Sequence, residues 1–549
     1  MSAFRRPGRP RPIRLVVVVL VPLLGCARPP ASDDRAGEAA EATPAAPSSD
    51  PPPDFVARPP DPPTRGLVVD TAGATDGYVL FSPLVSDTTY LIDRRGRAVH
   101  TWKSRYSPGS ALYLLPNGHL LRNGRDPSLE NFRAGGTGGI FQELDWDGNV
   151  VWEWTFSNEE RVQHHDIQPL PNGNILALGW EVKSLEECAR VGRRPDLIPE
   201  RGLWPDFVVE IQPIRPDGAR IVWEWHVWDH LVQDHDAALP NYGDPVRHPG
   251  RLDVNALGAR PEMDPEELER LKALGYVPAD AEPQELESDF LHVNAVSYQA
   301  ALDQIALSVP EAGEVWIIDH GTTTKQAAGS TGGRRGRGGE LLYRWGNPRL
   351  YGRGDPSGQR LFYQHAVHWI PEGRSGAGHL LLFNNGRGRA GGSWSSVDQV
   401  APPLGRDGRY ALEDGEPFGP PRLSWTYAHR ETFYAPFISG AHRISNGHTM
   451  ICSGPSGRFF EVDPGGRIVW EYWNPYQGDV RMADGTLPQP GVDRYPYAVF
   501  QAQKLEVDHP ALRGRKLAPL DPPPPIAVAP GPLVAVDSRS ERTHPQGTP

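Results

Sequence analysis

Histidine recurs at one position of a repeated sequence pattern. Turns such as Leu-Pro-Asn-Gly follow short apolar strands at several places, and the residue six positions before the second residue of each turn, such as Pro171, occupies an equivalent position from unit to unit. Two of these units place a histidine there, His165 and His365, and two place a serine, Ser110 and Ser439. In a further unit His292 starts the corresponding strand. Three units therefore offer an imidazole at an equivalent position.

Three equivalent imidazoles could carry out more than one kind of chemistry. Neutral imidazole nitrogens bind zinc, copper or iron, and a hydrolytic metal ion lowers the pKa of its bound water. Alternatively, one histidine is a nucleophile and the others exchange protons as acid and base. The spacing alone does not decide between these readings.

The repeat also predicts the elements that position these histidines. One hairpin turns at Asp-Gly or a similar pair and ends in tryptophan, as Asp147-Gly148 does before Trp152-Glu153-Trp154. A second hairpin follows about 20 residues later around the Pro-Asn-Gly turn. Two hairpins make four strands, which is a propeller blade, so residues 65–516 are predicted to form an all-β, six-bladed β-propeller of four-stranded antiparallel blades. Equivalent inner-strand positions surround the channel of a propeller, so the three histidines should converge on one pocket, while the tryptophans pack the blades.

Composition excludes several classes of protein. Gly and Pro number 59 each among 549 residues, which makes a bundle of long helices unfavourable. The net charge of −12 gives no basic field to attract nucleic acid. The sequence contains no phosphate loop of the type G-x-x-x-x-G-K-[ST]. Six blades over residues 65–516 are large, and the excess length lies in loops such as 243–290, which includes a short predicted helix at 264–274, and 386–425.

The N-terminal segment is typical of an export signal. Residues 1–25 hold five arginines and then the apolar run Leu15–Leu24, which is too short to span a bilayer of about 30 Å. The sequence Leu-Leu-Gly-Cys that ends at Cys26 resembles the bacterial lipobox, in which the cysteine is lipidated. Residues 26–64 have the composition of a disordered, Pro- and Ala-rich tether, and residues 517–549 that of a Pro-rich flexible tail. We expect an exported lipoprotein on the periplasmic or outer-surface face of a bacterial membrane. In such an oxidising compartment Cys188 and Cys452 could form a disulfide or stay free.

The histidine motifs resemble those of the bacterial arylsulfate sulfotransferases. The resemblance rests on three segments: His164-His165-Asp166 with its Pro-Asn-Gly turn, His292-Val293-Asn294-Ala295 with Ser308, and Gln364-His365-Ala366 with the strand that ends in Phe383-Asn384-Asn385-Gly386. It covers most of residues 75–500. It implies an exported six-bladed propeller that moves a sulfuryl group from a phenolic sulfate ester to a phenolic acceptor. The route is a ping-pong reaction through a sulfohistidine, without a cofactor and without the cytosolic nucleotide sulfate donor.

The resemblance also implies roles for single residues. His365 matches the sulfated nucleophile of the family, and His165 and His292 match its two further pocket histidines. We expect neighbours of these motifs to bind substrate: Asn294, Asn385, His164 and His442.

One position departs from the family pattern. The family has an arginine eighteen residues after the histidine that matches His292, and here that place is Pro310. His320, Lys325 or Arg387 could supply the missing charge. Alternatively, the protein is a propeller that binds a ligand or partner without catalysis, or a hydrolase that holds a metal ion on its histidines. The family's N-terminal β-sandwich, which contributes to dimers, has no counterpart here, so the chain could be monomeric.

Overall fold

Antiparallel strands build the structure, which is a computed structural model. It describes residues 65–526 apart from Val85 and the segments 260–263, 274–276, 278–279 and 478–496. The expected signal peptide, Cys26 and the tether up to residue 64 lie outside the described residues, as does the tail beyond residue 526.

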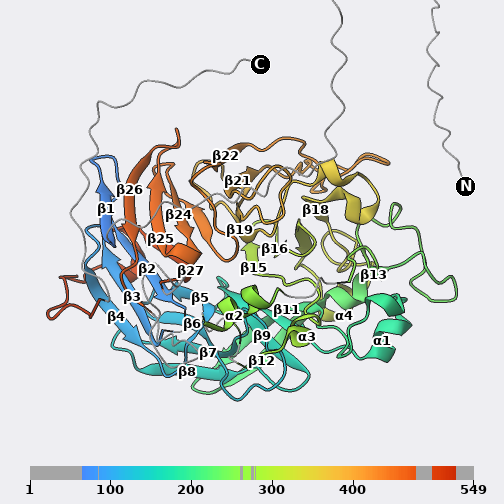
Figure 1. Cartoon of the computed structure of the whole chain (residues 1–549), viewed down its shortest axis with the longest axis horizontal. Coiled ribbons are helices and arrows are strands. Elements are labelled where there is room, and N and C mark those ends of the chain that lie inside the picture. Colours follow the sequence, from blue (N-terminus) through green and yellow to red (C-terminus); the bar gives the residue numbers. More distant parts are fainter. Residues whose placement is uncertain are drawn as a thin grey trace, which may run out of the picture. The chain divides into compact units, whose positions relative to one another are not determined.

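Six sheets form the blades of a propeller, which confirms the predicted fold, and their inner strands gather at the centre of the view in Figure 1. From the centre outward, the first three blades are as follows. The first holds β27 (Val499–Leu505), β2 (Tyr78–Pro83), β3 (Thr88–Asp93) and β4 (Ala98–Lys103). The second holds β5 (Pro108–Leu114), β6 (Leu120–Arg125), β7 (Gly139–Leu144) and β8 (Val150–Thr155). The third holds β9 (Arg161–Pro169), β10 (Ile175–Glu181), β11 (Asp206–Ile214) and β12 (Gly218–His226).

The last three blades follow the same order. The fourth holds β15 (Ala295–Gln299), β16 (Gln304–Val309), β17 (Glu314–Asp319) and β18 (Tyr343–Trp345). The fifth holds β19 (His365–Trp369), β20 (Leu380–Asn384), β21 (Ser396–Val400) and β22 (Trp425–Ala428). The sixth holds β23 (Gly440–Arg443), β24 (Thr449–Ser453), β25 (Arg458–Val462) and β26 (Ile468–Trp473), with β1 (Gly66–Asp70) added at its outer edge.

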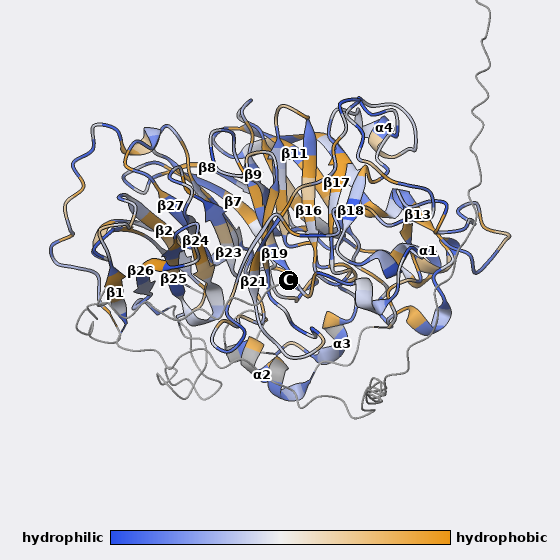
Figure 2. Ribbon diagram, turned by 90° about the horizontal axis from the view of Figure 1, so that it is seen from above, coloured by the Kyte–Doolittle hydropathy of each residue, from blue (hydrophilic) through white to orange (hydrophobic). Residues whose placement is uncertain are grey.

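Short helices and one small strand pair lie in the connections between the blade strands. The helices are α1 (Leu185–Arg190), α2 (Pro265–Ala273), α3 (Pro283–Leu286) and α4 (Thr324–Ala327), and β13 (Leu231–Val232) pairs in parallel with β14 (Leu252–Asp253). The predicted helix at 264–274 is α2. Seen from above in Figure 2, α2 and α3 lie on one face of the propeller and α4 lies on the opposite face. No helix among the described residues is both long and apolar enough to cross a membrane.

Tryptophans at the outer strands join each blade to the next. The indole N–H of Trp102 donates to the carbonyl of Asp145 at 3.0 Å, that of Trp152 to Gly218 at 2.8 Å and that of Trp470 to Arg94 at 2.8 Å. All three rings are almost completely buried. A buried tryptophan needs a partner for its N–H, and the turn of the neighbouring blade supplies one. The repeated tryptophans therefore pack the blades.

The two ends of the described chain close the ring of blades twice. Strand β27 pairs with β2 as the inner strand of the first blade, while β1 pairs with β26 in the last blade. The two closing strands thus come from opposite ends of the described chain. Residues after β27 also pack on the first blade, because the backbone N–H of Leu520 donates to the carbonyl of Ala98 at 2.8 Å.

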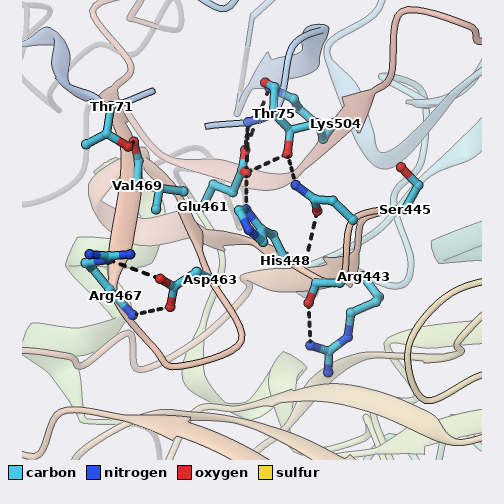
Figure 3. A network of polar contacts seen from close by, with 12 residues as sticks. Thr71, Thr75, Arg443, Ser445, His448, Glu461, Asp463, Arg467, Val469 and Lys504 are labelled. Atoms are coloured by element: carbon cyan, nitrogen blue, oxygen red, sulfur yellow. Dashed lines mark hydrogen bonds and ion pairs between the residues drawn. The ribbon is translucent and has the colours of Figure 1, made fainter. Parts of the chain in front are cut away.

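A buried polar network fixes this closure (Figure 3). Glu461 on β25 accepts hydrogen bonds from the hydroxyl of Thr75 at 2.6 Å and from the ring of His448 at 2.7 Å. The ammonium group of Lys504 on β27 donates to the carbonyl of Thr75 at 2.7 Å and lies 4.0 Å from the Glu461 carboxylate. Neither charged side chain is accessible to solvent. The network therefore joins the connection after β1 to the first and last blades.

Removing the charge of Glu461 should destabilise the closed ring. In a Glu461→Gln variant the buried ammonium group of Lys504 loses its counter-charge, which costs about 3–5 kcal/mol in comparable buried pairs. Urea unfolding at neutral pH measures the change. Arg467→Gln is a matched control, because Arg467 pairs with Asp463 at a largely exposed site in the same blade and should change stability by less than about 1 kcal/mol. Equal effects of the two substitutions would contradict the role given to the network.

Cys188 and Cys452 are both free and buried. Cys188 lies in α1 and Cys452 in β24, and burial raises the pKa of both thiols, that of Cys188 to about 11. The structure thus shows no disulfide between them.

Candidate active site

An irregular backbone recurs at the histidine position of the inner strands. His165 and His292 have φ angles of 47° and 57°, and the two serines at the matching positions, Ser110 and Ser439, have φ angles of 119° and 86°. Next to His365, Ala366 has a φ angle of 55°. Residues with side chains seldom adopt this left-handed region, and such outliers gather at functional sites.

The pairing of the strands shows the same irregularity. The register of β9 against β10 shifts beside His165, and that of β19 against β20 shifts just after His365. A bulge of this kind changes the direction of a side chain. At His165 and His365 the recurring sequence position therefore coincides with an irregularity in the strand pairing.

The three predicted histidines meet in one cluster. The rings of His165 and His292 lie 4.4 Å apart between centroids. Tyr363 connects His292 to His365, with its ring centroid 6.2 Å from the first and 5.8 Å from the second. Phe500 on β27 lies 6.0 Å from His165 and 6.2 Å from His365. All three histidine residues are at least 95% buried, so reacting groups here would be shielded from bulk water.

One ring nitrogen of His365 is hydrogen-bonded, and the other is available to react. The side-chain NH₂ of Asn385 donates to the carbonyls of Ala435 at 2.7 Å and Ile438 at 2.9 Å, which turns its oxygen toward His365. Nδ1 of His365 lies 2.9 Å from that oxygen and must therefore carry the proton. Nε2 is then a lone-pair nitrogen, and it is buried without a hydrogen-bond partner in the described part of the chain. Burial lowers the pKa of His365 to about 3, so the ring is neutral at neutral pH.

His292 is held by a carboxylate. Its Nδ1 hydrogen-bonds the carboxylate of Asp289, three residues earlier, and both side chains are buried. The carboxylate orients the imidazole and balances positive charge when Nε2 also carries a proton. A carboxylate–imidazole pair of this kind can give a proton to a leaving group and take one from an incoming group.

His165 is oriented by its neighbour. Its Nδ1 lies 2.8 Å from Nδ1 of His164, so one of the two rings donates and the other accepts. His164 stacks on Trp180 with 3.9 Å between ring centroids, and its Nε2 lies 3.2 Å from the carboxylate of Asp206. Burial is the main cause that lowers the pKa of His164 to about 3 and that of His165 well below its usual range. Both rings are thus neutral, and His164 positions His165.

Apolar and aromatic side chains surround the histidines. Trp180, Trp204, Phe437 and Phe500 belong to one buried cluster with Leu268 of α2, which comes from the long connection before the fourth blade. Figure 1 shows α2 lying across the centre of the blades. Aromatic walls of this kind suit the ring of a small aromatic ligand.

A cavity of about 720 Å³ lies beside this cluster. Leu129 lines it and also packs against the aromatic cluster. Arg125 lines it as well, and its charge is one of the causes of the low pKa of His165. The volume is within the range of pockets that hold small organic molecules.

The other residues expected to bind substrate divide into two groups. Asn294 is buried, and its NH₂ donates at 2.9 Å to the carbonyl of Gln364, so it fixes the residue before His365. Asn385 and His164 contact His365 and His165 directly, as described above. His442 is not brought to the cluster: its Nε2 accepts the backbone N–H of Lys504 at 3.0 Å, farther along β23.

Two of the three candidates for the missing charge lie away from the histidines. His320 follows β17, and its nitrogens hydrogen-bond Glu210 at 3.0 Å and Asp303 at 2.8 Å, which joins the third blade to the fourth. Lys325 is exposed on α4, on the face opposite to α2. Pro310 lies in the β16–β17 turn, where the N–H of Glu311 donates to the carbonyl of Leu291. Only Arg387 among these candidates lies near the cluster, with its guanidinium carbon 5.1 Å from the ring centroid of Tyr363.

Gly136 packs directly against the imidazole of His165, and replacing this glycine should disrupt the site. The N–H of His165 donates to its carbonyl at 2.6 Å, and a Cβ on Gly136 would lie 2.1 Å from the imidazole. In Gly136→Ala we expect displacement of the imidazole and at least about a 10²-fold loss of activity, because misplaced catalytic groups cost that much. Gly173→Ala is the matched control, since Gly173 has the same left-handed φ but no atom within 4 Å of an added Cβ. Similar losses in both variants, measured as kcat/KM, would contradict this role.

Two contacts of the site were not predicted from the sequence. Asp289 could have been found, because it stands three residues before His292 and an acidic residue near a candidate histidine is a readable signal. Tyr363 stands two residues before His365, but no repeat marks it, and its ring reaches His292 on another blade.

The described residues contain no group of three or more His, Cys, Asp or Glu side chains placed to hold a metal ion.

Comparison with known proteins classifies the chain. The model of the family described as arylsulfotransferase (ASST) matches residues 78–470, from the start of β2 to β26. No curated protein matches the chain.

Several solved structures match the chain at low sequence identity and low TM-score. A protein of unknown function from Bacteroides caccae is 10% identical, with a TM-score of 0.38, and the match covers 78% of this chain and 98% of that one. A putative 6-phosphogluconolactonase from Bacteroides fragilis is 8% identical, with a TM-score of 0.34 and coverages of 79% and 99%. A virginiamycin B lyase from Staphylococcus aureus is 9% identical, with a TM-score of 0.30 and coverages of 75% and 89%. The family match spans most of the chain and includes all three clustered histidines, so the protein belongs to the arylsulfotransferase family.

Proposed function

We propose that this protein is an arylsulfate sulfotransferase that moves a sulfuryl group from a phenolic sulfate ester to a phenol through a sulfated His365. Family membership supports sulfuryl transfer between aryl groups. The observation that carries the mechanism is the state of His365, whose Nδ1 proton is held by Asn385 while Nε2 has no partner in the described part of the chain.

In the first half-reaction the lone pair on Nε2 of His365 attacks the sulfur of the donor. The N–S bond forms, the bond between sulfur and the phenolic oxygen breaks, and the electron pair leaves with the phenolate. His292 gives its Nε2 proton to that oxygen, so a neutral phenol departs. The sulfated imidazole carries a positive charge, which the oxygen of Asn385 stabilises through the Nδ1–H group. Splitting the transfer in this way replaces one difficult step by two easier ones.

In the second half-reaction a phenol takes the place of the first product. His292, now without its Nε2 proton, removes the proton of the phenolic hydroxyl while Asp289 holds the imidazole. The phenolate oxygen attacks sulfur, the N–S bond breaks, and its electrons return to Nε2 of His365. The enzyme is restored, and neither a cofactor nor water enters the balance.

Acceptor dependence tests the proposal. The purified protein is incubated with 4-nitrophenyl sulfate, with and without phenol, and both nitrophenol and phenyl sulfate are measured. We expect nitrophenol release to depend on phenol, with phenyl sulfate formed in equal amount. Release of inorganic sulfate at a rate independent of phenol would indicate a hydrolase, and metal analysis would then be informative. No release from any aryl sulfate would favour a propeller that binds its ligand without catalysis.

We also propose that the mature protein is exported and anchored to a membrane through lipidated Cys26, on the periplasmic or outer-surface face. The basic and apolar signal before Cys26 supports this location. A donor that is an aryl sulfate fits it, because no nucleotide cofactor from the cytosol is required. We propose that the chain acts as a monomer.

A further inference from the structure

A guanidinium group lies beside the histidine cluster and has no anionic partner among the described residues. Arg387 follows β20, is exposed, and has its guanidinium carbon 5.1 Å from the centroid of the Tyr363 ring. It makes no ion pair with a carboxylate in the ranges that the structure describes. The same Tyr363 ring is next to both His292 and His365. A cation at the edge of a buried histidine pocket is a place for an anion.

The backbone on both sides of Arg387 fixes this position. Asn385 holds His365, and the N–H of Gly386 donates at 2.8 Å to the carbonyl of Phe362, next to Tyr363. Gly386 has a φ angle of 80°, and a Cβ there would lie 1.8 Å from the carbonyl oxygen of Trp394. Only glycine fits this turn. Three consecutive residues, 385–387, thus orient the nucleophile, attach the loop and present the guanidinium.

Two further arginines make the same loop region cationic. The guanidinium of Arg389 lies 3.7 Å from the centroid of the Trp394 ring and 5.2 Å from that of Phe362. Arg430 lies 5.0 Å from the Trp394 ring. Neither forms an ion pair with a carboxylate among the described residues. The rim beside Tyr363 therefore combines positive charge with aromatic faces, which matches a ligand that is both aromatic and anionic.

The conformation of Tyr363 is a second, independent sign of function at this place. Its φ angle is 60°, in the left-handed region that favours glycine. This backbone conformation costs a tyrosine about 1 kcal/mol or more, and residues strained in this way are concentrated at functional sites. Here the strained residue lies between the histidines and Arg387.

We propose that Arg387 binds the sulfate oxygens of the aryl sulfate donor while the Tyr363 ring packs against its aryl group. This inference rests on the proposed function and assigns the recognition of the anionic end of the donor to a loop of the fifth blade. Guanidinium N–H groups match the oxygens of a sulfate ester in charge and geometry. They also stabilise the charge that these oxygens carry as sulfur moves from the phenolic oxygen to Nε2 of His365.

Substitution of Arg387 tests this assignment. In Arg387→Gln we expect kcat/KM for 4-nitrophenyl sulfate to fall by about 10²–10³-fold, the loss that follows removal of one comparable oxyanion donor. Arg387→Lys should recover part of the loss. In Arg387→Ala, added guanidinium ion should restore activity, which a structural role would not produce. Arg406→Gln is the matched control, because Arg406 is also exposed but lies in the β21–β22 connection at the other end of the fifth blade.

A binding measurement separates this inference from the proposed function. Calorimetric titration of 4-nitrophenyl sulfate into His365→Asn protein, with and without Arg387→Gln, reports donor binding in the absence of turnover. We expect Arg387→Gln to weaken this binding at least about tenfold, the effect of one lost charged hydrogen bond, and to leave the binding of uncharged 4-nitrophenol unchanged. If the Arg387→Gln variant transfers the sulfuryl group with the same kinetics as the wild type, the role of Arg387 is refuted and the proposed function stands. Absence of transfer by the wild type would instead refute the proposed function, while the titration still tests Arg387.

Discussion

A His365→Asn variant should fold normally and lose sulfuryl transfer by a factor on the order of 10⁶, the loss found when the nucleophile of a covalent enzyme is removed. Asparagine can keep a hydrogen bond toward Asn385 but has no nitrogen lone pair that can attack sulfur. The variant should still bind the aryl sulfate donor. The measurement is phenol-dependent release of nitrophenol from 4-nitrophenyl sulfate.

His368→Gln is the matched control for this substitution. His368 is another neutral histidine of β19, with its pKa lowered by burial, but its Nδ1 hydrogen-bonds the carbonyl of Ala366 and it lies three residues farther along the strand. We expect this variant to keep most of the activity. Retention of transfer by His365→Asn, or equal loss in both variants, would show that the nucleophile is elsewhere.

An Asp289→Asn variant should lose about 10²–10⁴-fold in kcat/KM, the contribution of one general acid–base group. The amide cannot balance positive charge on His292, so the proton needed by the leaving phenolate is no longer well held. The loss should depend on the donor. Phenyl sulfate, whose leaving group is strongly basic, should be affected more than 4-nitrophenyl sulfate, whose leaving group departs without much help.

Glu287→Gln is the control for this second substitution. Glu287 lines the same small cavity as Asp289 but makes no contact with the histidines among the described interactions. We expect its activity to remain close to that of the wild type. A loss in Asp289→Asn that is the same for both donors would indicate that Asp289 only supports the fold.

The fold could be predicted from the sequence because its signals are local. Asp-Gly and Pro-Asn-Gly turns determine the hairpins, and the outer tryptophans recur because each must reach the next blade, as Trp152 reaches Gly218. The closure of the ring was not predicted in detail. The pairing of β1 with β26 and of β27 with β2 joins segments far apart in the chain, and no local pattern encodes that register.

The candidate site could be predicted in part for a similar reason. His165 and His365 lie at shifts in the pairing of their inner strands, and His292 lies just before the inner strand of its blade, so their equivalent positions in the sequence bring them together in space. His442 does not join them, since it stands three residues beyond Ser439, which occupies that position in its own blade. Tyr363 and Asp289 come from the connections before their strands. Connections differ from blade to blade, so the repeat gives no information about them.

The most direct test of the mechanism is to trap the sulfated enzyme. Wild-type protein is mixed with 4-nitrophenyl sulfate in the absence of any phenol acceptor, quenched under alkaline conditions and digested for mass spectrometry. We predict one added sulfuryl group on the peptide that contains His365, assigned to that residue by fragmentation and removed when phenol is supplied before the quench. A sulfuryl group on another residue, or transfer to phenol with no sulfated enzyme formed, would contradict the mechanism.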